Sequence, residues 1–129
     1  MKLTKVMNAA YRRLDAHHNN KTVIAQLFAQ VFYFMANSVL NKFLTTPDLC
    51  RASRAYAVKV AYSHMEIWAS EKSDLINHMR NQFDILLEAC NVLVIDKSIF
   101  AAEDIIPTVF LKLNPKQIKQ LLVSFQPDE

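Results

Sequence analysis

Glycine is absent from all 129 residues of the chain, although average usage is about 7%. This absence excludes several kinds of site, because phosphate-binding loops, dinucleotide-binding fingerprints and nucleophile elbows all require glycine. Type I′ hairpin turns also lose their preferred residue, which disfavours an antiparallel sheet. We therefore expect helices joined by turns that contain proline, asparagine or aspartate.

The chain also has few cysteines and only a small net charge. Cys50 and Cys90 are the only cysteines, too few for the disulfide framework of a small secreted domain, and the first segment does not resemble a secretory leader. The net charge is +3, with 15 basic and 12 acidic residues interleaved. Nucleic-acid binding would need basic residues gathered on one face beside stacking aromatics, whereas adjacent basic residues occur here only in short pairs such as Arg12-Arg13. We expect a reduced, cytoplasmic protein that binds no nucleic acid.

The chain is rich in apolar residues at helical spacing. Its length fits one domain over residues 1–129, and 52% hydrophobic residues fit a globular fold. The spacing predicts an all-α, compact bundle of five to six helices. We expect an additional N-terminal helix within residues 1–18 and further helices over 22–44, 47–71 and 73–94. A short helix or turn near 100–106 and a last helix from 114 to about 126 complete the prediction.

Three helix starts carry capping signals. Thr46 precedes Pro47 in the pattern of a cap followed by proline in the first turn. Ser73 can cap the fourth helix in the same way. Asn114 is followed by proline and, three residues on, by Gln117, which predicts a capping box.

The predicted core comes from the apolar stripes of these helices. The third helix should also make apolar contacts through Ala52, Tyr56, Val60, Met65 and Ile67. The residues that we expect at the centre are Phe28, Val31, Phe32, Met35, Leu49, Trp68, Met79, Phe83, Leu87 and Leu121.

The second helix contains no charged residue between Lys21 and Lys42, so its length also matches a membrane span. Its amides, Gln26, Gln30, Asn37 and Asn41, recur on one side of the helix and would need partners in hydrocarbon. We therefore expect a mostly buried core helix with one polar seam, and no transmembrane segment. The seam either bonds to neighbouring helices or forms the floor of a peptide-binding groove.

Candidate catalytic and metal-binding residues are few. His17, His18, His64 and His78 lack the closely spaced ligand pairs of a zinc site, so we expect no metal and no cofactor. Cys90 lies on an apolar stripe, whereas Cys50 lies in the expected first turn of the third helix, where the helix dipole could lower its pKa. No base can be paired with either thiol. The remote alternative is a small helical enzyme that uses a cysteine or a histidine.

A binding surface is the better hypothesis. Arg51, Arg54 and Lys59, with Tyr62 near their continuation, form a loosely shared basic face on the third helix. Arginine and tyrosine are favoured at protein interfaces. The alternative is an ordinary solvated face.

The order of motifs over residues 22–129 resembles the dilute (DIL) domain, which occurs in the cargo-binding tails of class V myosins and in afadin-like scaffolds of cell junctions. The resemblance is carried by QLFAQVFYFM (26–35), NKFL (41–44), PDLC (47–50) and HMEIWA (64–69). The last of these and the terminal PDE (127–129) are closer to the afadin-like form. The tryptophan that often follows "LC" and the later glycine of the myosin form are missing here.

The resemblance implies a non-enzymatic protein-binding module within a larger cytoplasmic protein. Its partners would be adaptor or cytoskeleton-linked proteins at cell junctions, the actin cytoskeleton or vesicle surfaces. Any peripheral membrane association would come through the parent protein. We expect an afadin-like scaffold, with the cargo-binding tail of a class V myosin-like motor as the alternative.

Overall fold

The computed structural model describes residues 2–17, 20–95 and 110–127. Within these ranges the fold is all-α and contains no strand. The helices are α1 (Lys2–Ala16), α2 (Lys21–Thr45), α3 (Ala52–Ser70), α4 (Ser73–Val94) and α6 (Pro115–Ser124), with a short 3₁₀ helix η1 (Pro47–Leu49) between α2 and α3. The predicted element near 100–106 and the terminal residues 128–129 lie outside the described residues.

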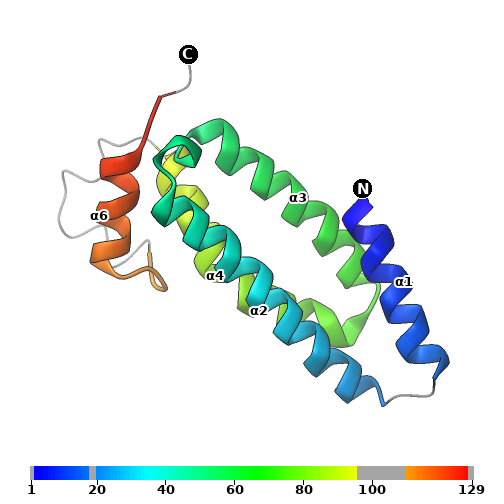
Figure 1. Ribbon diagram of the computed structural model, residues 1–129. Coiled ribbons are helices and arrows are strands. Elements are labelled where there is room, and N and C mark those ends of the chain that lie inside the picture. The colour runs from blue at the N-terminus through cyan, green and yellow to red at the C-terminus, as the bar shows by residue number, and fades with distance from the viewer. Residues whose placement is uncertain (1, 18–19, 96–109, 128–129) are drawn as a thin grey trace.

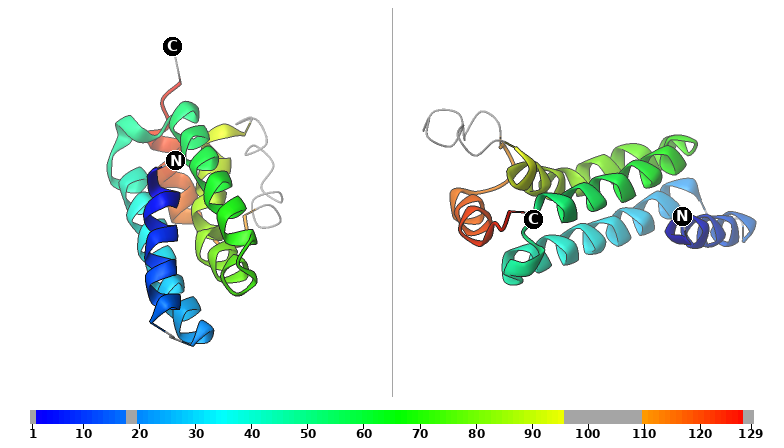
Figure 2. Two further views of the ribbon diagram at one scale, coloured as in Figure 1. Left: turned by 90° about the vertical axis from the view of Figure 1, so that its right-hand side faces the viewer. Right: turned by 90° about the horizontal axis from the view of Figure 1, so that it is seen from above.

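Three long helices form the body of the molecule. The helix α4 packs against both α2 and α3, whereas α2 and α3 scarcely touch each other. Figure 1 shows α1 at one end of these helices and α6 at the other, and the view from above in Figure 2 agrees. Both faces of α4 therefore contribute to the core.

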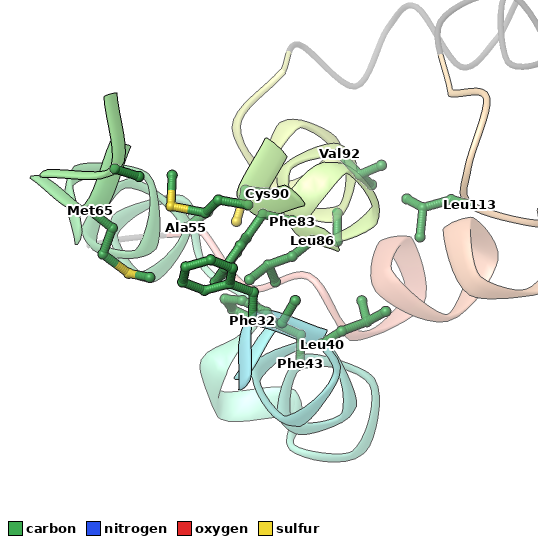
Figure 3. Packing of buried hydrophobic residues seen from close by; sticks show 14 of the residues in the cluster. Phe32, Leu40, Phe43, Ala55, Met65, Phe83, Leu86, Cys90, Val92 and Leu113 are labelled. Atoms are coloured by element: carbon green, nitrogen blue, oxygen red, sulfur yellow. The ribbon is translucent and has the colours of Figure 1, made fainter. Parts of the chain in front are cut away.

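The core is built from side chains spaced three or four residues apart. On α2, Phe28, Phe32, Ala36 and Leu40 are buried at four-residue intervals, which places them on one face of the helix. In Figure 3, Phe32 and Leu40 point toward Phe83 and Leu86 of α4. The cluster also contains Trp68, Met79 and Leu121.

Four of the expected core residues lie outside its centre. Val31 is 46% exposed, because it lies on the outer face of α2, one position before the buried Phe32. Met35 and Leu49 are half-buried and pack against the edge of the core. Leu87 is half-buried beside a surface depression that Glu88 and Lys112 also line. The contacts expected from α3 were also partly wrong, since Tyr56, Val60 and Ile67 are exposed.

The capping predictions had different outcomes. The capping box of α6 is present: the Gln117 N–H donates to Asn114 Oδ1 at 2.8 Å, and the Asn114 N–H donates to Gln117 Oε1 at 3.1 Å. The prediction of one helix from residue 47 was wrong. Pro47 begins only the 3₁₀ turn, the side chain of Thr46 makes no cap hydrogen bond, and α3 starts at Ala52. The N-cap position of α4 is occupied by Lys72 rather than Ser73.

The polar seam of α2 was predicted within a mostly buried helix, but it lies on an exposed outer face. Gln26, Gln30 and Asn41 are exposed, and Asn37 donates to the carbonyl of Tyr33 within the same helix at 2.8 Å. Among the described residues, α2 is the one helix whose length and composition would suit a membrane span. Its inner face, however, packs against α4, and this burial accounts for its row of phenylalanines. Exposed apolar residues share the outer face with the amides: Val23, Leu27, Val31 and Phe34.

Candidate functional site

The predicted basic face does not form one exposed patch. Arg51 is half-buried, and its guanidinium donates to Gln126 Oε1 at 2.8 Å and to the carbonyl of Pro127 at 3.2 Å. The backbone supports this contact, because the Gln126 N–H donates to the carbonyl of Cys50 at 2.8 Å. Arg51 thus holds the segment that follows α6 against the start of α3.

Lys59 and Tyr62 are turned toward α4. The Nζ atom of Lys59 donates to Asn91 Oδ1 at 2.9 Å. The ring of Tyr62 lies 5.5 Å from that of Phe83, and burial, followed by a hydrogen bond with Glu66, raises the pKa of Tyr62 above its usual value. Arg54 is the one member of the predicted set that is exposed rather than half-buried.

The thiols are packed rather than poised for reaction. Cys50 is buried between η1 and α3, and its Sγ donates to the carbonyl of Phe43 at 3.0 Å. Burial raises the pKa of Cys50, in contrast to the lowering expected from a helix N-terminus, because α3 begins two residues later. Burial likewise raises the pKa of Cys90 to about 12, against the opposing charge of Lys59. Both are protonated at neutral pH, and a protonated thiol is a poor nucleophile.

Metal ligation finds no support in the ranges that the structure describes. No group of three or more histidine, cysteine, aspartate or glutamate residues there stands close enough to hold an ion. His17, His64 and His78 are exposed, and His18 lies outside the described residues.

An apolar groove runs between α2 and α3, over the surface of α4. Two cavities that share lining residues mark it, with volumes of about 230 and 130 Å³. Val39 of α2 and Val58 of α3 line both of them. Met35, Met65 and Phe83 line the smaller one, and Phe43, Leu49 and Ala57 line the larger one. The groove exists because both helices pack against α4 and leave a space between them.

One end of this groove is filled by α1. Leu3 lines the smaller cavity, and Met7 is buried. The ring of Tyr11 lies 6.1 Å from that of Phe28 on α2 and 6.3 Å from that of Trp68 on α3, so Tyr11 sits between the two helices. The larger cavity lies beyond Leu3, and cationic residues of both helices, Lys42 and Arg54, stand beside it.

A second, more polar cleft of about 610 Å³ lies between α1 and α3. Within it, Trp68 Nε1 donates to Asn8 Oδ1 at 3.2 Å. The Nζ atom of Lys72 lies 4.8 Å from the ring centre of Trp68 and 5.3 Å from that of Tyr11, a cation–π arrangement. These contacts bind α1 to α3 and give the cleft a structural role.

Two members of the predicted set line this groove: Arg54 beside the larger cavity and Tyr62 beside the smaller one. The sequence did not identify Lys42, Val39, Ala57 and Val58, which line the groove only because α2 and α3 both pack against α4. The sequence contained only a weak signal for this groove. Both helices have more apolar residues than a single core-facing side requires, and the additional ones could have indicated a second apolar surface.

Comparison with known proteins yields one family and several relatives. The family model described as "DIL domain" matches residues 26–129. The myosin-H heavy chain of Dictyostelium discoideum is 26% identical over 117 residues, or 89% of this chain. Unconventional myosin-Va of Gallus gallus is 22% identical and unconventional myosin-Vb of Mus musculus 23% identical, each over 97% of this chain. The chain spans about 7% of the length of each of these relatives.

Proposed function

Because this chain belongs to the DIL domain family and is homologous to tail regions of class V myosins and myosin-H, we propose that it links a cargo or adaptor protein to an actin-based motor. The DIL domain is a non-catalytic binding module of myosin tails. The expected afadin-like scaffold is not indicated by these relatives. The relatives named above are myosins, and they support the class V myosin-like alternative better.

The observation that carries this proposal is the open apolar groove between α2 and α3. A concave, apolar surface with a few polar groups at its edge is the usual form of a recognition site. The buried, protonated state of both thiols argues against the cysteine enzyme. The proposed partner is a protein on the cytoplasmic surface of a vesicle or on the actin cytoskeleton, and any membrane association of the module would be indirect.

Deletion of residues 26–129 from the parent protein tests this function. We expect association with vesicles or other cargo to fall to background, as measured by co-sedimentation and by imaging of moving particles. Actin binding and actin-activated ATP hydrolysis should stay unchanged, because these would belong to other parts of a motor. Full cargo association after the deletion would refute the proposal, and loss of ATP hydrolysis alone would refute the assignment of a binding role.

A further inference from the structure

We propose that the open part of the α2–α3 groove binds an amphipathic partner helix that carries acidic residues along both of its flanks. This inference rests on the proposed binding function and specifies the chemistry of the partner. The open part of the groove consists of Val39, Lys42, Phe43, Leu49, Arg54, Ala57 and Val58.

The helix α1 shows what this groove accepts. It presents Leu3, Met7 and Tyr11 to the other helices, four residues apart and therefore on one face. Leu3 lies near Met35 and Val39, whereas Tyr11 lies near Phe28, so α1 runs antiparallel to α2. The groove thus already holds one amphipathic helix by apolar side chains at i and i+4 spacing.

The groove continues past Leu3 with the same kind of lining. Val39 and Val58 are shared by the occupied and the open parts. Beyond them, α2 advances from Val39 to Phe43 and α3 from Val58 to Arg54, each by about 6 Å at 1.5 Å per residue. A partner helix would therefore place two apolar side chains, one turn apart, in the open part. Helix-in-groove binding uses this spacing of anchors.

The positive charges at the edge of the groove favour acidic residues on the two flanks of the partner helix. Lys42 stands on the α2 side and Arg54 on the α3 side, and both are exposed. Among the described residues the one ion pair is formed by Arg80 and Glu66, so neither of these two cations is paired with an acid there. An acidic residue on each flank of a bound helix would meet one cation on each wall.

The same charges argue against a second copy of this chain as the occupant. The amphipathic helix that a second copy would offer is α1, whose exposed residues include Lys2, Lys5, Arg12 and Arg13. Like charges facing each other across an interface suppress pairing. A separate protein with an acidic helix fits the groove better.

Two synthetic helical peptides test the proposal on the intact chain. Both carry leucines at i and i+4 of the same face; one has glutamates on its flanks, and the other has lysines. Fluorescence anisotropy should show the glutamate peptide binding at least tenfold more tightly. Methyl NMR signals of Val39 and Val58 should shift when it binds. Equal affinity for the two peptides, binding of neither, or shifts confined to other residues would overturn the proposal.

Matched variants locate the site. Ala57→Glu places a charge in the groove at an exposed position. It should lower the affinity for the glutamate peptide at least tenfold and leave the Tm of the protein unchanged. Ala9→Glu makes the same change on the exposed side of α1 and should have no effect. Equal effects of the two variants would show that the peptide does not occupy the groove.

Charge reversal tests the acidic flanks. Lys42→Glu combined with Arg54→Glu should invert the preference, so that the lysine peptide binds more tightly. Arg13→Glu combined with Lys21→Glu changes the net charge by the same amount but lies near the other end of α2. This control should still bind the glutamate peptide more tightly than the lysine peptide. Loss of the preference in both double variants would mean non-specific attraction and would reject the site.

Two further results separate this inference from the function on which it rests. Sedimentation of the chain as a dimer that Ala57→Glu dissociates would make a second copy the occupant and overturn the proposal. If Ala57→Glu in the parent protein leaves cargo association intact while deletion of residues 26–129 abolishes it, the binding function stands and the groove is rejected.

Discussion

At the scale of the residue, Arg51 shows how a tertiary contact changes the role of a cation that the sequence pattern placed on an exposed face. Its guanidinium bonds to Gln126 and Pro127, 75 and 76 positions away. Arg54, three residues later on α3, has no such contact and lies at the edge of the groove. The two arginines look equivalent in the sequence, but only Arg54 is free to meet a partner.

We predict that Arg51→Glu lowers the free energy of unfolding by about 1–2 kcal/mol, because two charge-assisted hydrogen bonds are lost and the surface exposure moderates the effect. Arg54→Glu should change it by less than about 0.5 kcal/mol. Urea denaturation followed by circular dichroism measures both values. If the two variants are equally stable, the contact with Gln126 and Pro127 does not hold the end of the chain.

At the scale of the element, α2 has one buried and one exposed apolar face. Phe32 is fully buried between α4 and the rest of the core, whereas Val31 lies on the outer face. The composition of α2 conceals this difference, because both faces contain large apolar residues. Neighbouring substitutions can therefore test the rotation of the helix about its own axis.

We predict that Phe32→Ala lowers the free energy of unfolding by about 3–5 kcal/mol, since it removes a buried ring that contacts Phe28 and Phe83. Val31→Ala should cost less than about 1 kcal/mol, because its side chain is half-exposed. Thermal and urea unfolding of the two variants give the comparison. A larger cost for Val31→Ala would place the wrong face of α2 in the core.

At the scale of the whole molecule, α4 is the element on which the others depend. It packs against α2, α3 and α6, whereas α1 contributes one buried residue, Met7, and rests on α2 and α3. Glu88 of α4 also accepts hydrogen bonds from the N–H groups of Lys112 and Leu113 at 2.7 and 2.9 Å. The stability of this bundle should therefore differ between its helices.

We predict that amide hydrogens in the middle of α4 exchange at least tenfold more slowly than those in the middle of α1. Exchange from α4 requires global unfolding, whereas α1 can detach and leave most of the core intact. Hydrogen–deuterium exchange read by NMR at neutral pH measures both. Equal protection of the two helices would mean that α1 is an integral part of the core and that its end of the groove never opens.

Much of the fold could be predicted from local chemistry. The boundaries of α1 and α2 lie within two residues of the prediction, and the capping box at Asn114 and Gln117 is present as its spacing required. The start of α3 was misplaced, because Pro47 suits the first turn of a 3₁₀ helix as well as that of an α-helix. The candidate site was only partly predictable, since one of its two cations was identified and its apolar lining was not.

The sequence by itself determined the existence of the helices, the capping box of α6 and the membership of the DIL family, because these depend on residue types at short spacings. The tertiary structure decided which apolar residues are buried, which cations are exposed and where a groove opens. Val31 and Phe32, or Arg51 and Arg54, differ only in what lies beside them. The physical reason is that burial and charge pairing depend on contacts between segments far apart in the chain. The sequence pattern of one helix does not contain those contacts.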